Sequence, residues 1–148
     1  MSLKQRLQDD VKTAMKSGAK QALGTLRLVM AEIKQREVDD NITLDDAQIL
    51  AVLDKMLKKR RDALSQFQQA QREDLVAQEQ FEIELIQGYL PTPLDPAALD
   101  ALLQASVMAT GAVGLKDLGK VMAQVKPQLQ GRADMSVVSQ RLKALLTA

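Results

Sequence analysis

The sequence predicts an all-α protein: an N-terminal bundle of about four helices joined by a proline-rich linker to a compact three-helix tail. Three observations support this fold class. Aromatic residues make up 2% of the 148 residues and hydrophobic residues 46%, so the core must consist of Leu, Ile, Val, Met and Ala, a mixture that favours helix over sheet. Apolar residues recur at helical spacing. Residues that cap helix N-termini stand before several of these stretches.

The first two helices are predicted between Ser2 and Asn41. Ser2 and Gln5 have the spacing of a capping box, and apolar residues follow at helical spacing up to Gly18. The second helix ends near Asn41. Its apolar stripe consists of Leu23, Leu26, Met30 and Ile33.

A long third helix and a shorter fourth one complete the predicted bundle. Thr43 and Asp46 are read as the capping box that starts the third helix. A break is expected between residues 71 and 74, followed by a helix over residues 75–88. The apolar stripe of the third helix consists of Leu50, Leu53, Leu57, Leu64 and Phe67.

The clearest boundary lies at residues 91–96, which hold three of the four prolines and are expected to be an extended linker. We therefore divide the chain into an N-terminal domain (1–90), the linker (91–96) and a tail domain (96–148). In the tail, Asp95 is expected to cap a helix that ends at Gly111. A short helix follows over residues 115–126, stopped by Pro127, and Asp134 or Ser136 caps the last helix.

The chain contains no His and no Cys. These residues provide the commonest general base near neutral pH, the thiolate nucleophiles and the usual zinc ligands. We therefore expect no catalytic residues, no metal and no cofactor. Neighbouring carboxylates such as Asp39 and Asp40 are read as helix ends and solubilising groups, not as a metal site.

The cellular location is predicted from the absence of a signal core and of a membrane-spanning run. The N-terminal stretch has no apolar signal core, no apolar run approaches membrane-spanning length, and there are no disulfides. The expectation is a cytoplasmic protein with no membrane partner. The net charge of +1 gives no sign of a strongly basic nucleic-acid domain.

The third helix contains a basic run, and one of its members is out of place. Arg60 falls on the apolar stripe, where it needs a carboxylate partner or must reach solvent. Glu32, Glu37, Glu79 and Glu82 are the candidate partners. The rest of the run is either an ordinary charged face or a second basic surface for an anion or a phosphate backbone. That surface would consist of Lys55, Lys58, Lys59 and Arg61.

The tail combines glycines with positive charge. Four of the seven glycines stand at positions 111, 114, 119 and 131, among Lys116, Lys120, Lys126 and Arg132. A glycine inside a helix costs about 1 kcal/mol relative to Ala, so Gly119 predicts a close helix approach or contact with something large. The stretch either docks on a phosphate backbone or packs tightly with solvated lysines.

Several stretches resemble the GatB/YqeY family. LKDLGKVMAQVKPQLQGRAD followed by VVSQRLKALL is similar to the tail of that family. KMLKKRRDALSQFQQAQREDL, the YLP at the linker and LRLVMAEIKQREVD resemble its stand-alone YqeY-like members. Two positions depart from the family pattern: Gln71 replaces a glycine in a turn, and Met135 follows GRAD in place of glycine.

The resemblance implies a function as well as an all-α fold. The tail is similar to that of the B subunit of the glutamine-dependent tRNA amidotransferase, which contacts tRNA, but the chain has no counterpart of the subunit's catalytic domain. The leading hypothesis is therefore a tRNA-binding accessory module without stand-alone enzyme activity. By resemblance, Lys120 and Arg132 would face RNA first, with Lys116 and Lys126 as second choices.

Two alternatives remain open from the sequence. One is a protein–protein adaptor for an aminoacyl-tRNA synthetase or an amidotransferase subunit. The other is carbon–nitrogen ligase activity with glutamine as amido donor, by family inheritance only. No DNA partner is expected.

Overall fold

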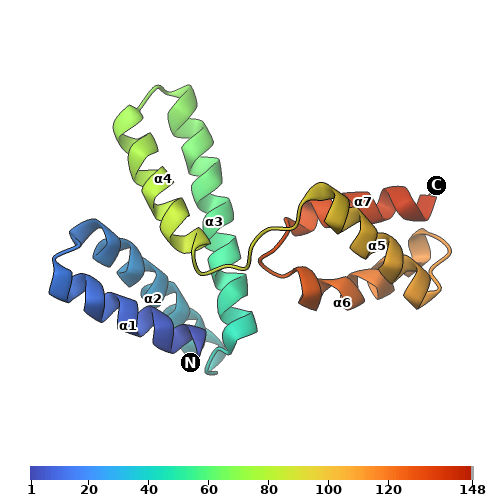
Figure 1. The fold of residues 1–148 in the computed structure, drawn as a ribbon, viewed down its shortest axis with the longest axis horizontal. Helices are drawn as coiled ribbons and strands as arrows, with labels where there is room; N and C mark the ends of the chain where they lie inside the picture. The colour runs from blue at the N-terminus through green and yellow to red at the C-terminus, as the bar shows by residue number, and fades with distance from the viewer. Residues whose placement is uncertain (148) are drawn as a thin grey trace. The chain divides into compact units, whose positions relative to one another are not determined.

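The computed structural model describes residues 1–147, which form seven α-helices and one short 3₁₀ helix with no strand among them (Figure 1). The predicted all-α fold class is confirmed. The chain divides into two compact units, Met1–Leu90 and Pro91–Ala148. Within the described residues, no single helix is long and apolar enough to cross a membrane, although one pair of tail helices bent by 95° would pass that test together.

The first unit consists of two helical hairpins, seen in blue and in green in Figure 1. They are formed by α1 (Leu3–Ser17) with α2 (Lys20–Asp40), and by α3 (Asp46–Gln69) with α4 (Glu73–Gln87). One apolar core joins all four helices, because each helix buries one stripe against its neighbours. Its most buried side chains are Leu7, Val29, Ile33, Ile49, Leu53, Leu57 and Ile86.

The capping box of α1 forms as predicted, between Ser2 and Gln5. The prediction for α3 is wrong by two residues, because Asp45 and Gln48 form its capping box. The Asp45 carboxylate accepts from the Gln48 N–H at 2.8 Å, and the Gln48 side chain accepts from the Asp45 N–H at 2.9 Å. Asp46 instead accepts from the N–H of Leu3 at 2.9 Å, so its carboxylate ties the start of α1 to the start of α3.

Glu37 links three segments of this unit. Its carboxylate accepts from the Lys4 ammonium at 2.9 and 3.0 Å and from the Leu44 N–H at 2.8 Å. The hydrogen bond from Lys4, with that from Leu44, lowers the pKa of Glu37 below its ordinary value. Glu37 is therefore committed to Lys4, and its candidacy as a partner of Arg60 is wrong.

The turn between α3 and α4 places Gln71 at φ +57°, in the left-handed region that favours glycine. Gln71 is one of the two departures from the family pattern noted in the sequence. The structure thus gives the physical reason why glycine suits this position.

The second unit contains α5 (Pro96–Thr110), the 3₁₀ helix Leu115–Asp117, α6 (Leu118–Leu129) and α7 (Met135–Thr147). Asp95 caps α5 as predicted, with Pro96 at the first helical position and Gly111 at its end. The three α-helices enclose a second, separate apolar core. Its buried members are Leu99, Leu103, Val121, Val125, Leu129, Val138 and Leu142.

Two predicted boundaries in this unit are corrected. Pro127 does not stop α6, which runs to Leu129. Pro127 has no N–H to donate to the carbonyl four residues earlier, yet the helix continues for two more residues and ends at the buried Leu129. Of the two residues considered as the cap of α7, Asp134 takes the role, since its carboxylate accepts from the Ser136 N–H at 2.8 Å.

We predict that Gln71→Gly stabilises the protein. The substitution removes the cost of holding a residue with a side chain in the left-handed region, about 1–2 kcal/mol. It also costs about 0.5–1 kcal/mol, because glycine loses more backbone entropy on folding. In urea unfolding, the free energy of unfolding should rise by up to about 1 kcal/mol. The matched control is Gln68→Gly in the last turn of α3, which should lose about 1 kcal/mol. A loss in both variants would contradict the prediction.

We also predict that Glu37→Gln destabilises the protein at neutral pH and that its deficit disappears in acid. A pKa lowered by folding means that the carboxylate contributes stability above its unfolded pKa and loses it as the pH falls through its folded pKa. Urea unfolding at several pH values measures the deficit. Glu84→Gln, at an exposed position of α4, is the control and should be nearly neutral throughout. A deficit that persists below the folded pKa of Glu37 would exclude an electrostatic origin.

Candidate functional site

The three lysines predicted in the tail are all exposed on the second unit. Lys116 lies in the 3₁₀ helix, and Lys120 and Lys126 lie on α6. At 100° per residue, Lys120 and Lys126 are about 120° apart on the surface of α6. The opposite side of α6 buries Val121, Val125 and Leu129 in the core. Because the helix has a single apolar face, its lysines are left to solvent; we call Lys116, Lys120 and Lys126 the tail lysines.

Gly119 lies between two of the tail lysines. A Cβ built on it would have no heavy atom within 4 Å, so the close helix approach predicted at this glycine is wrong. Gly119 is exposed and is the second residue of α6, where it leaves the backbone without a covering side chain. The backbone of α6 is therefore unusually accessible beside Lys120.

Arg132 does not lie on α6 but in the loop before α7. Its Nε–H donates to the Thr92 carbonyl at 3.3 Å, and its own carbonyl accepts from the Leu94 N–H at 3.1 Å. Arg132 therefore fastens residues 92–94 to the second unit. The Arg132 side chain is half-buried, whereas the tail lysines are exposed. Arg132 therefore differs from them in structural role as well as in position.

Three large apolar side chains are exposed in and around the loop between α5 and the 3₁₀ helix. Met108 near the end of α5 is 83% exposed, Val113 in the following loop 79%, and Leu115 51%. The Asp117 carboxylate accepts from the Val113 N–H at 2.9 Å and holds this loop in place. These residues could not be predicted as a surface from the sequence, because isolated apolar residues carry no signal until their exposure is known.

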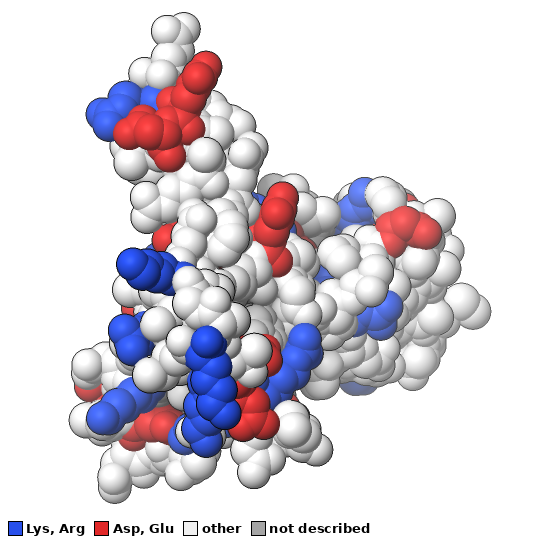
Figure 2. All heavy atoms as spheres, turned by 60° about the vertical axis from the view of Figure 1, so that its left-hand side comes forward, with Lys and Arg blue, Asp and Glu red and all other residues white. Residues whose placement is uncertain are grey.

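In the first unit, the candidate basic surface of Lys55, Lys58, Lys59 and Arg61 is exposed along α3. Arg61 donates to the Gln87 side chain at 2.7 Å. Figure 2 shows basic and acidic side chains interspersed on the face it presents, so no large patch of one sign forms there.

Arg60 forms the buried ion pair that its position on the apolar stripe required. Its guanidinium contacts Glu82 and lies 3.6 Å from Glu79, both on α4. The side chain of Arg60 is 17% exposed and that of Glu82 only 8%. Burial, followed by the nearby charge of Glu82, raises the pKa of Glu79, and Arg60 partly offsets this. Arg60 Nε and one oxygen of Glu79 are buried without a hydrogen-bond partner.

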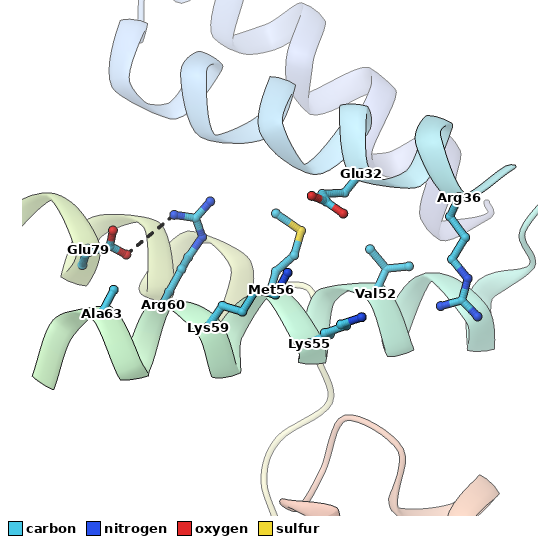
Figure 3. A pocket seen from close by; sticks show the side chains of 9 residues that line it. All are labelled: Glu32, Arg36, Val52, Lys55, Met56, Lys59, Arg60, Ala63 and Glu79. Atoms are coloured by element: carbon cyan, nitrogen blue, oxygen red, sulfur yellow. Dashed lines mark ion pairs between the residues drawn. The ribbon is translucent and has the colours of Figure 1, made fainter. Parts of the chain in front are cut away.

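A pocket of about 340 Å³ opens between α2 and α3 beside this ion pair (Figure 3). Val52, Met56 and Ala63 provide its apolar surface. Figure 3 shows Glu32 and Arg36 projecting from α2 and two lysines projecting from α3. The remaining lining residues are Lys55, Lys59, Arg60 and Glu79.

The pocket brings together two of the predicted surface lysines with two residues that the sequence analysis did not assign to a site. Glu32 was considered only as a partner of Arg60, and Arg36 was not considered. Glu32 and Arg36 are one helical turn apart and so share a face. Nothing in the local sequence shows that this face lies opposite Lys55 and Lys59. Among residues 1–147, no three carboxylates converge to hold a metal ion.

Comparison with known proteins identifies relatives along the whole chain. A relative from Pyrenophora tritici-repentis, named altered inheritance of mitochondria protein 41, is 32% identical over 97% of this chain and 80% of its own length. Proteins of the same name from Eremothecium gossypii and Kluyveromyces lactis are 33% and 29% identical. Those matches cover 80% and 93% of this chain, and 67% and 72% of the relatives.

These names overturn one prediction. All three relatives are named as mitochondrial proteins, which contradicts the cytoplasmic location expected from the sequence. Composition was a poor guide here, because the absence of disulfides and of a secretory signal core does not distinguish between compartments inside the cell. The family model described as Yqey-like protein matches residues 4–146. The chain therefore belongs to the YqeY-like protein family.

Proposed function

We propose that this protein is an RNA-binding accessory module whose ligand is tRNA, contacted through the tail lysines. The observation that carries the proposal is a group of three exposed lysines in the second unit, two of which, Lys116 and Lys120, lie close in sequence to an exposed glycine, Gly119. None of the three lysines forms an ion pair with the described residues, so each ammonium is available to an outside anion.

The physical basis is contact with the phosphate backbone. Lysine acts as a mobile point charge that neutralises phosphates and releases counterions, and A-form RNA is recognised largely by shape and backbone. Gly119 would let a sugar–phosphate strand approach α6 more closely than any other residue allows. With three lysines and a net charge of +1, the interaction is weak and strongly salt-dependent.

Arg132 supports this surface from another position. By holding residues 92–94, it fixes the start of the second unit, while its remaining guanidinium nitrogens extend the basic character of the loop before α7. We therefore assign Arg132 a positioning role in addition to the RNA contact predicted by resemblance. Replacing it would combine a stability effect with a binding effect, and it is unsuitable for a first test.

A second candidate function is that of a protein adaptor, for which the exposed Met108, Val113 and Leu115 are the favouring observation. Exposed large apolar side chains close together in a chain mark contact surfaces for other proteins. The two functions respond oppositely to salt. Phosphate contacts weaken steeply as salt rises, whereas an apolar interface changes little.

We predict that Lys116→Glu with Lys120→Glu abolishes most tRNA binding. Fluorescence anisotropy with labelled total tRNA, at about 50 and about 200 mM salt, should show at least about tenfold weaker binding at low salt. The slope of log K against log salt should fall by about 2, one for each lost phosphate contact.

The control replaces Lys34 on α2 and Lys143 on α7 by Glu, which changes the net charge equally at exposed positions outside the tail lysines. It should keep most of the binding. Equal losses in the two double variants would mean that only net charge matters and would refute a docking face on α6. Salt-insensitive capture of a protein partner, lost in Met108→Ser, would favour the adaptor.

A further inference from the structure

We propose that the pocket between α2 and α3 is a nucleotide-binding site, taking a nucleoside monophosphate that is either free or the terminal nucleotide of an RNA strand. The inference deepens the proposed RNA function but concerns a separate site, in the first unit, with its own residues. Its volume of about 340 Å³ lies in the range of small-ligand pockets, about 300–1,000 Å³.

The phosphate position is set by two lysines on α3. Lys55 and Lys59 are one helical turn apart, exposed, and both line the pocket. Neither forms an ion pair with the described residues, so two ammonium groups on one face of a helix remain uncompensated. A dianionic phosphate between them would pair with both.

The opposite wall can bind the sugar. Glu32 projects from α2 across Met56 from the lysines, as Figure 3 shows, and forms no ion pair with the described residues. A lone carboxylate facing two cations disfavours a bare anion but accepts hydrogen bonds from hydroxyl groups. The pair of ribose hydroxyls provides such donors at the other end of a molecule that carries phosphate.

The base has an apolar floor and a cation to stack on. Val52 and Met56 line the pocket with carbon and sulfur atoms, and the polarisable thioether of Met56 suits contact with a ring. Arg36 borders the same pocket and pairs with Asp40 only through an exposed contact of 3.5 Å, which holds it weakly. A guanidinium plane of this kind stacks on unpaired bases in RNA-binding proteins.

Arg60 and Glu79 border the pocket as an ion pair. Arg60 Nε and Glu79 Oε2 form no hydrogen bond, but both atoms are sealed from solvent, so they are not counted among the groups that would contact a ligand. Phosphate, sugar and base thus each have a matching group among the residues that line this one cavity.

The test measures binding of adenosine monophosphate to the full chain by NMR titration. We expect saturable shifts at residues of α2 and α3 around the pocket. Lys55→Ala with Lys59→Ala should weaken binding at least about tenfold, as expected for the loss of two charge-assisted contacts to phosphate. The control Lys34→Ala with Lys58→Ala, at exposed positions outside the pocket, should change it less than about twofold. Circular dichroism verifies that both variants fold.

Further measurements distinguish a free nucleotide, the end of an RNA strand and simple phosphate binding. Inorganic phosphate should compete far less well than adenosine monophosphate, and equal competition would overturn a nucleotide site. A 5′-phosphorylated RNA trinucleotide that binds at least as tightly as the mononucleotide would identify the end of an RNA strand as the source, and tighter binding of the mononucleotide would identify a free nucleotide. No saturable binding of either overturns the proposal. Lys116→Glu with Lys120→Glu should leave mononucleotide binding intact, so failure of the tail proposal and failure of this one are distinguishable.

Discussion

The ion pair between Arg60 and the carboxylates of α4 is the constraint on which the arrangement of the first unit depends. A guanidinium on the apolar stripe of α3 has to be matched, because an uncompensated buried charge costs about 3–5 kcal/mol. Glu82 and Glu79 meet that need only if α4 packs against α3 in one register. The ion pair therefore specifies how the second hairpin closes, and it also forms the polar end of the pocket beside α2.

The second unit is stabilised differently. The buried members of its core cluster are all Leu and Val. Its polar anchors are peripheral: Asp95 at the start of α5, Asp134 at the start of α7, and Arg132 holding the residues that enter the unit. Because the apolar side of α6 is fully used in this core, its charged side has no task in folding. That division makes the tail lysines available for contact with a ligand, while Arg132 serves both the fold and its surroundings.

The two units also place their basic residues in different ways. In the second unit, Lys116 and Lys120 are exposed and lie close in sequence to the exposed Gly119. On α3, Lys55 and Lys59 border a cavity, which suits one discrete group. The two proposed contacts therefore differ in kind: a cavity for one nucleotide in the first unit and an exposed surface for a strand in the second.

Helix identity and most helix ends followed from local sequence, since capping and apolar spacing act over a few residues: Ser2, Asp95 and Gly111 perform their predicted tasks. Tertiary structure decided what local sequence left open. Asp45 rather than Thr43 caps α3, and Asp46 is drawn to Leu3, a residue distant in sequence. Arg60 pairs with Glu82 and Glu79 of α4, whereas Glu37 pairs with Lys4. The pocket could not be predicted at all, because the faces of α2 and α3 meet only through packing, and no spacing within either helix encodes which face its neighbour presents.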